Sequence, residues 1–172
     1  PDADGGIAMA LVGQGSAASR RRTRFVTASA ARKLPAGTYA IASGLTDAAL
    51  EEAALGWLLE SYSFDRYTKP KPGAARLIAP DGIDAPRLEA IAAGEALTRD
   101  LINTPTSDMS PADLEDAARS LARRHAAQIS VITGDDLLSS NFPMIHAVGR
   151  ASATPPRLID MTWGDTGPHL TL

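Results

Sequence analysis

Short apolar runs bounded by Gly, Pro or charged residues recur along the chain, and this pattern indicates β-strands. The runs lie at residues 7–12, 24–27, 38–42, 76–79, 129–133, 158–163 and 169–172. The last two are separated by Gly-Asp-Thr-Gly-Pro at 164–168, and these turn residues predict a hairpin loop. A further apolar run at 145–148 is compatible with a strand or with a helix.

Apolar positions at three- and four-residue spacing predict three helices. The first begins after Thr46, a candidate N-cap. One face of it carries Leu50, Ala54, Trp57, Leu58 and Ser61. The second opens at Asp84-Ala-Pro86, where proline suits the first turn, and is stopped by Asn103-Thr-Pro105. The third begins at Ser110-Pro-Ala-Asp113, a pattern typical of a capped helix start, and runs to the basic residues before position 126.

Residues 62–72 break this periodicity, and their prolines predict a connecting loop. The chain therefore has strands with one helix, then a long helix, then a helix with further strands, which predicts an α/β protein built in two parts. We expect a first part at residues 1–83, a joining helix at 84–104 and a second part at 105–172. The apolar side of the joining helix should be buried by both parts.

Composition narrows the chemistry that these 172 residues can carry. The absence of cysteine excludes thiolate metal sites and thiol nucleophiles, and it gives a mild indication of a cytosolic protein. His125, His146 and His169 lie far apart in the sequence, so they do not form a zinc-binding motif. Residues 1–6 lack the pattern of a signal peptide, and no apolar run approaches the ~20 residues needed to cross a bilayer. We therefore expect no membrane partner.

A basic cluster at Arg20, Arg21, Arg22 and Arg24 stands out against a net charge of −3. Such a cluster can bind nucleic acid, but this one lacks interleaved aromatic residues, so we interpret it as a solvated turn before the strand at 24–27.

Two other sequence patterns are compatible with ligand binding but have simpler interpretations. The segment Gly13-Gln-Gly-Ser-Ala17 lacks the Lys of a phosphate-binding loop and reads as a turn that ends a strand. Asp135 and Asp136 are expected to cap a helix rather than to bind Mg²⁺. The residues by themselves contain no catalytic constellation, so we assign no catalytic, metal-binding or substrate-binding residue.

The segment at 98–111, Thr-Arg-Asp-Leu-Ile-Asn-Thr-Pro-Thr-Ser-Asp-Met-Ser-Pro, closely resembles leucyl aminopeptidases, also called cytosol aminopeptidases. In that family the corresponding segment ends the interdomain helix and opens the catalytic domain. Further stretches are similar to the same family. They lie at 34–39, 62–67, 142–152 and 155–159.

The resemblance implies an enzyme that removes N-terminal amino acids from peptides with two divalent cations, Zn²⁺ or Mn²⁺. In the family the first metal-ligand motif follows the strand that corresponds to residues 169–172. No metal ligand or substrate-pocket residue can therefore be carried onto this chain, and none of its residues is expected to bind the cofactor. By itself the chain should be inactive, a fragment that also lacks the first strands of the family's N-terminal domain.

The resemblance also implies a macro-like N-terminal domain, a cytoplasmic homo-hexamer and peptide substrates bound by the missing catalytic half. Some members of the family have a second, DNA-binding role. Two alternatives stay open. The chain could be a stand-alone macro-like or DNA-binding module that uses the cluster at Arg20 to Arg24, or it could belong to an aminopeptidase-like structural subunit that has lost its metals.

Overall fold

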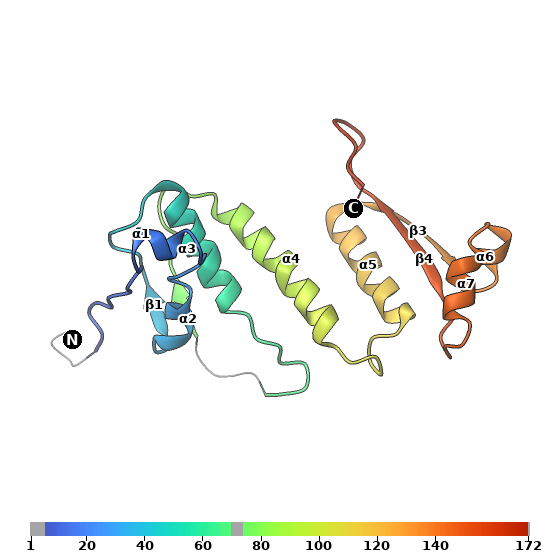
Figure 1. Ribbon diagram of the computed structural model, residues 1–172, viewed down its shortest axis with the longest axis horizontal. Coiled ribbons are helices and arrows are strands. Elements are labelled where there is room, and N and C mark those ends of the chain that lie inside the picture. The colour runs from blue at the N-terminus through green and yellow to red at the C-terminus, as the bar shows by residue number, and fades with distance from the viewer. Residues whose placement is uncertain (1–5, 70–73, 172) are drawn as a thin grey trace. The chain divides into compact units, whose positions relative to one another are not determined.

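The computed structural model of the protein describes residues 6–69 and 74–171 (Figure 1). It divides into two compact units, Pro1–Asp100 and Leu101–Leu172. The first contains α1 (Ala17–Arg20), α2 (Ser29–Lys33), β1 (Gly37–Tyr39), α3 (Asp47–Glu60), β2 (Ala75–Leu77) and most of α4 (Ala85–Asn103). The second contains α5 (Pro111–His125), β3 (Gln128–Thr133), α6 (Asp136–Ser139), α7 (Pro143–Gly149) and β4 (Arg157–Thr162). Each unit mixes helices with strands, as the sequence predicts.

In the first unit, β1 and β2 pair in parallel, with Gly37 opposite Ala75 and Tyr39 opposite Leu77. Parallel strands need a crossover, and α3 lies in this one. Trp57 on α3 is buried and donates its indole N–H to the carbonyl of Ala75 over 3.2 Å. The core of the unit forms where Ala30 and Ala31 of α2 pack with Trp57 of α3 and Ala75 of β2.

The segment at 24–27 is not a strand, and α3 explains why. The backbone N–H of Phe25 donates to Glu52 Oε1 over 3.1 Å, and Arg24 forms an ion pair with Glu52 Oε2 over 3.3 Å. Phe25 has a φ of +57°, in the left-handed region that interrupts extended backbone. Gly56 makes room for this turn, since a Cβ there would lie 3.0 Å from the Phe25 ring.

The run at 7–12 is also not a strand, although its sequence favours one. Within the described residues no strand pairs with it, and Met9 and Leu11 are exposed. The Gly-rich segment after it begins a helix instead of ending a strand, because the Ser16 hydroxyl accepts the N–H of Ser19 and caps α1. Both strand predictions near the N-terminus were therefore wrong.

Helix α4 contacts α3 and the start of the loop that follows α3. The guanidinium of Arg99 donates to the carbonyl of Leu59 over 3.1 Å and lies 5.3 Å from the centroid of the Tyr62 ring. Leu88 is buried, whereas Ile91 and Ile102 are exposed. Within the first unit the apolar side of this helix is therefore only partly covered, since Ile91 is exposed. The predicted loop at 62–72 is irregular as far as residue 69, and its remainder lies outside the described residues.

In the second unit, α5 begins with a capping box in which Ser110 and Asp113 each bond the other's backbone N–H. Strands β3 and β4 pair antiparallel, from Gln128 opposite Thr162 to Thr133 opposite Arg157. The uncertain run at 145–148 lies in α7, a helix that begins at Pro143. Leu137 on α6 is fully buried in this unit.

The predicted hairpin at 164–168 does not form. The partner of β4 is β3, and residues 169–171 belong to no strand, while Leu172 lies outside the described residues. The indole N–H of Trp163 donates to the carbonyl of His125 over 2.9 Å, which directs the chain toward the end of α5. Among the described residues, no helix is long and apolar enough to span a bilayer.

Candidate functional site

The sequence-based candidates do not converge into a metal site. His146 Nε2 lies 3.0 Å from Asp135 Oδ1, and this contact replaces the expected cap, since the Asp135 side chain makes no cap hydrogen bond to α6. The Asp135 side chain is 95% exposed. Across residues 6–69 and 74–171 no group of three or more His, Cys, Asp or Glu side chains could hold a metal ion. A two-cation site needs several converging donors, so the described residues do not fit one.

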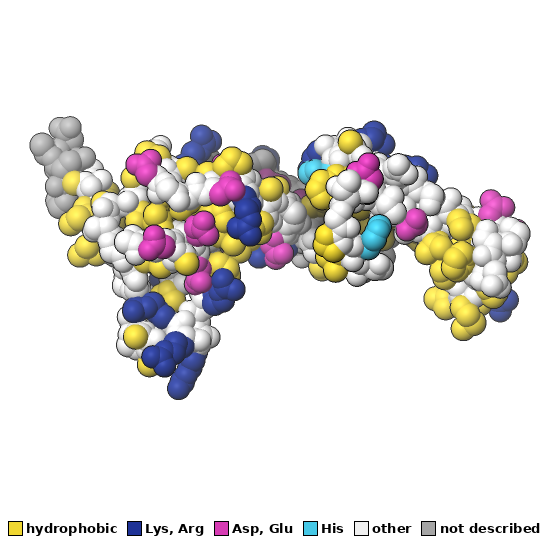
Figure 2. Space-filling view, turned by 90° about the horizontal axis from the view of Figure 1, so that it is seen from above, with side chains coloured by type: hydrophobic (Ala, Val, Ile, Leu, Met, Phe, Trp, Pro, Cys, Tyr) yellow, Lys and Arg dark blue, Asp and Glu magenta, His cyan; other side chains and the backbone are white. Residues whose placement is uncertain are grey.

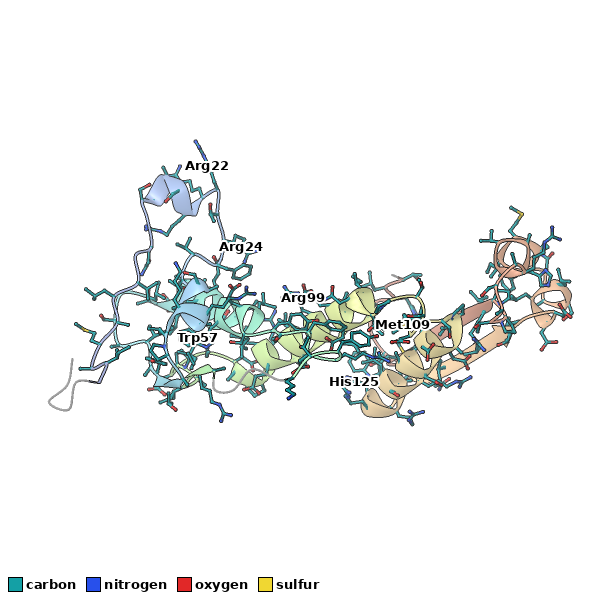
Figure 3. All side chains as sticks on the ribbon, turned by 90° about the horizontal axis from the view of Figure 1, so that it is seen from below. Arg22, Arg24, Trp57, Arg99, Met109 and His125 are labelled. Carbon is teal, nitrogen blue, oxygen red and sulfur yellow. The ribbon has the colours of Figure 1, made fainter. Side chains whose placement is uncertain are left out.

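The basic cluster is partly neutralised. Arg20 donates to the carbonyl of Gly15 over 2.8 Å, while Arg24 pairs with Glu52 and lies 5.1 Å from the centroid of the Phe25 ring. Figure 3 shows Arg22 at the outer end of the segment that carries α1, with Arg24 closer to α3. Arg22 is exposed. Two of the four guanidinium groups thus serve the local fold of the first unit.

Three charged side chains of the second unit form a cluster, here called the Arg–Glu–Arg cluster: Glu115, Arg119 and Arg157. Glu115 and Arg119 lie one turn apart on α5, and Arg157 is the first residue of β4. Glu115 Oε1 lies 2.7 Å from the Arg119 guanidinium, and Glu115 Oε2 lies 2.6 Å from Arg157 Nε. The side chains of Glu115 and Arg157 are only 16% and 13% exposed. One carboxylate therefore links α5 to β4.

Two guanidinium groups lower the pKa of Glu115 from its ordinary value. The hydrogen bond from Arg119 is the largest cause, and the positive charges of Arg119 and Arg157 act in the same direction. Removal from water opposes them by favouring the neutral acid. Because two cations share one anion, the cluster keeps an excess positive charge when Glu115 is ionised.

Arg157 has hydrogen-bonding capacity to spare. Its Nε and Nη1 are both buried. Nε contacts Glu115 Oε2 over 2.6 Å, and a hydrogen bond from Arg157 is among the causes that lower the pKa of Glu115. Nη1 has no acceptor within the described part of the chain. Buried donors are normally paired in native proteins, because an unpaired one loses its water without compensation. One buried donor of Arg157, Nη1, therefore lacks a compensating hydrogen bond within the described residues.

A cavity of about 490 Å³ adjoins this guanidinium, and we call it the α7 pocket. Its lining residues are Pro111, Met144, Ile145, Val148, Gly149, Ser152, Thr154, Pro156 and Arg157. Gly149 lets α7 approach the chain before β4 closely, since a Cβ there would lie 2.3 Å from Pro156 Cβ. Hydrophobic side chains gather over α6 and α7 in Figure 2, and Met144 and Val148 are 75% and 83% exposed. The pocket combines an apolar wall with one buried cation.

The candidates suggested by the sequence did not include this site. The spacing of Glu115 and Arg119 is a readable signal, because residues four apart on a helix are neighbours. Nothing local indicates that Arg157 joins them, since it lies on another element and meets Glu115 only through the fold.

Comparisons with known families match nearly the whole chain. The model described as the M17 aminopeptidase N-terminal domain matches residues 1–80. The model described as the catalytic domain of the cytosol aminopeptidase family matches residues 96–171.

Curated relatives give the same result. A probable cytosol aminopeptidase of Geobacter sp. (strain M21) is 38% identical over 144 residues, which are 77% of this chain and 29% of that protein. A probable cytosol aminopeptidase of Leifsonia xyli subsp. xyli (strain CTCB07) is 32% identical over an alignment of 187 residues, covering 100% of this chain and 38% of the relative.

Solved structures also resemble the chain. Cytosol aminopeptidase from Coxiella burnetii superposes with a TM-score of 0.76 and 36% identity, over 83% of this chain and 31% of that one. The bottromycin maturation enzyme BotP in complex with Mn gives a TM-score of 0.70 and 28% identity, over 89% of this chain and 34% of that one. The chain thus spans about a third of the length of these relatives.

Proposed function

The chain belongs to the cytosol aminopeptidase family, and from that membership we propose that it is the N-terminal part of a metallo-aminopeptidase that removes amino acids from the N-termini of peptides. One observation carries the proposal: the N-terminal and catalytic family models match consecutive parts of the chain, at 1–80 and 96–171. Family membership confirms the resemblance carried by residues 98–111, and the α/β class is confirmed with it.

The proposed division of labour places a macro-like domain at 1–83, the interdomain helix at 84–104 and the opening of the catalytic domain at 105–172. It is supported by the gap between the two family matches, which falls at residues 81–95 and includes the first half of α4. In this proposal the 172 residues scaffold and assemble the enzyme, and the reacting groups lie outside them.

Two divalent cations, Zn²⁺ or Mn²⁺, are proposed for the parent enzyme. A similar protein, BotP, is known in complex with Mn, which supports a metal requirement in the family. When bound, such a pair of cations would polarise the scissile carbonyl and activate a water. The described residues of this chain offer no matching donor set, so their contribution is to position the sheet and helices on which a site could be built.

The deciding experiment is to read the gene beyond Leu172 and to assay its whole product. The proposal expects a Lys and an Asp within about a dozen codons, as the family motif requires, and hydrolysis of a leucyl amide that depends on added Zn²⁺ or Mn²⁺. A whole product without those residues and without metal-dependent turnover would favour the structural-subunit alternative.

Homo-hexameric assembly in the cytoplasm is proposed for the same whole product, and the names of the curated relatives support the compartment. Its mass in solution, measured by light scattering, tests the assembly. A monomer at micromolar concentration would exclude the hexamer.

The alternative of a DNA-binding module has less support, because two of the four arginines of the basic cluster are held locally. Binding through phosphates would weaken steeply as salt rises. The variant Arg21→Ala/Arg22→Ala tests it, since neither residue supports the turn that Arg24 forms with Glu52. Equal duplex affinity in the variant and the parent chain would dismiss the cluster as a nucleic-acid site.

A further inference from the structure

The turn between β2 and α4 contains the pair Asp81-Gly82, the one place in the described residues where glycine directly follows aspartate. Both residues are exposed. Gly82 has a φ of +83°, which glycine adopts without strain, and nothing lies within 4 Å of the position that a Cβ would take there. Neither a side chain on Gly82 nor a neighbouring element therefore crowds the peptide bond between the two residues.

Neither reactive group of this pair is held by the fold. Within the described part of the chain, no hydrogen bond involves the carboxylate of Asp81 or the backbone N–H of Gly82. Rotation of the Asp81 side chain and backbone can bring Cγ to the Gly82 nitrogen and close a five-membered ring. In an exposed turn this rotation breaks no such bond and uncovers no buried side chain, so its free-energy cost is small.

We propose that Asp81 is a site of spontaneous isomerisation to isoaspartate, independent of the proposed peptidase function. The Gly82 nitrogen attacks Asp81 Cγ, the N–H proton and the hydroxyl of the protonated carboxyl leave together as water, and a succinimide forms. Water then adds to either carbonyl of the ring. Addition at Cγ restores aspartate, whereas addition at the backbone carbonyl leaves the main chain running through Cβ and Cγ, with a free α-carboxylate. The mass is unchanged overall, and the reaction needs no reactant other than water.

The product changes the connection between β2 and α4, because it lengthens the main chain by one carbon. Leu88 in the first turn of α4 is buried, so packing fixes the start of this helix. The extra carbon must therefore be accommodated in the turn at residues 78–84. This turn lies where the N-terminal family match ends, at residue 80.

Asp84, three residues further along the chain, is the opposite case. Its Oδ1 accepts the backbone N–H of Arg87 over 3.1 Å. The N–H that follows it, from Ala85, donates to the carbonyl of Ile83 over 3.1 Å. Ring closure at Asp84 would break both hydrogen bonds, so the fold should protect this aspartate.

The test is prolonged incubation of the 172-residue chain at neutral pH, followed by trypsin digestion, chromatography and mass spectrometry. Trypsin cuts after Arg76 and Arg87, so the peptide 77–87 carries both aspartates. The other Asp-Gly pair, at 4–5, lies outside the described residues and falls on a different peptide. Incubation in water enriched in heavy oxygen, with digestion in ordinary water, labels only the isoaspartate that formed before digestion.

Isoaspartate should accumulate at Asp81 in the folded chain at a rate within an order of magnitude of that in the synthetic peptide 77–87, because the fold places no large barrier on ring closure. Circular dichroism follows the fold during the incubation. A folded chain that isomerises at Asp81 more than an order of magnitude more slowly than the peptide would overturn the proposal, since the turn would then be protected.

Ala85→Gly is the matched control for the contribution of the fold, because it places glycine after both aspartates. In the synthetic peptide with this change, the two aspartates should isomerise at similar rates. In the folded variant, Asp81 should convert several-fold faster than Asp84, whose carboxylate stays bonded to the N–H of Arg87. The same ratio of the two rates in chain and peptide would contradict the structural assignment.

Asp81→Glu keeps the charge at an exposed position, but its ring would need six members and closes much more slowly. This variant should give no labelled isomer of the peptide 77–87 over the time in which the parent chain converts. A labelled isomer at the same level in the variant would show that the reaction does not occur at Asp81.

Discussion

At the scale of single residues, the contacts of Glu115 connect two elements that no local sequence signal relates. Its carboxylate meets Arg119 on the same helix and Arg157 on β4, and both contacts are shorter than 3 Å. Glu115 and Arg157 are mostly shielded from solvent, so removing the carboxylate would leave two like charges near each other with no anion between them.

The lowered pKa of Glu115 makes the stability of the second unit sensitive to acid. The pKa of a glutamate in an unfolded chain is about 4.3. Because the pKa of Glu115 in the folded chain is lowered, the unfolded state binds protons first as the pH falls. The contribution is fully present above the unfolded pKa and is lost as the pH falls through the folded one. Urea midpoints measured from neutral pH down to pH 3 should therefore fall less steeply in Glu115→Gln than in the parent chain.

Asp116→Asn is the control for that series, because Asp116 is the next residue on the same helix and is exposed. Its midpoints should follow those of the parent chain at every pH. If the urea midpoints of the parent chain and of Glu115→Gln fell equally with pH, the Arg–Glu–Arg cluster would make no pH-dependent contribution to the free energy of unfolding.

Gly149 offers a second residue-scale prediction, because α7 approaches Pro156 at this position. An added Cβ would lie 2.3 Å from Pro156 Cβ and 3.3 Å from Pro156 Cα, so the backbone would have to shift. Gly149→Ala should lower the free energy of unfolding by about 1–3 kcal/mol, the usual cost of overpacking. Gly94→Ala on α4 is the matched control, since nothing lies within 4 Å of its new Cβ. It should stabilise by about 0.5–1 kcal/mol, as Ala does in a helix interior.

At the scale of elements, helices followed the sequence more closely than strands did. The helix starts at Asp84 and Ser110 appear as predicted, because capping depends on residues three positions away. The runs at 7–12 and 169–171 form no strand, because a strand needs hydrogen-bond partners from a distant part of the chain. The strand predicted at 24–27 gave way to a turn because Glu52 on α3 binds Phe25 and Arg24.

The candidate site, too, could be predicted from the sequence only in part. The pair of Glu115 and Arg119 could be read from spacing, whereas the addition of Arg157 and the wall of the α7 pocket depend on how α5, α7 and β4 pack. The contact of Asp135 with His146 was equally unpredictable, since it joins the turn before α6 to the middle of α7.

The capping box of α5 carries an element-scale prediction. The Ser110 hydroxyl accepts the N–H of Asp113, while the Asp113 carboxylate accepts the N–H of Ser110 over 2.8 Å. Ser110→Ala removes one of these bonds and should destabilise the second unit by about 1 kcal/mol. Ser120→Ala on the same helix is the control. The Ser120 hydroxyl accepts a hydrogen bond from the Arg123 side chain at the exposed surface of the helix, so its removal should change stability by less than about 0.5 kcal/mol. Equal melting temperatures for the two variants would show that the Ser110 cap does not contribute to the stability of the second unit.

At the scale of the whole molecule, the chain is two α/β units that match successive parts of one enzyme family. The second unit supplies one antiparallel strand pair, β3 with β4, and the helices beside it. Metal-dependent peptidase chemistry needs several charged donors brought to one point. In the described residues, the contact of His146 with Asp135 brings two such donors together.

The small number of converging metal-ligating side chains therefore predicts how residues 1–172 behave with metal ions. The chain alone should bind neither Zn²⁺ nor Mn²⁺ stoichiometrically at micromolar concentration, and it should not hydrolyse a leucyl amide. Asp160 and Asp165 near the end of β4 have no metal-ligating group of three or more around them in the described structure. Calorimetric titration with each metal, followed by an assay of the same sample, makes the measurement. Asp135→Asn is the control for weak surface binding at His146, which it should abolish. Tight binding that survives in this variant, together with amide turnover, would place the catalytic metals within these residues and refute the assignment of the chemistry to the remainder of the parent enzyme.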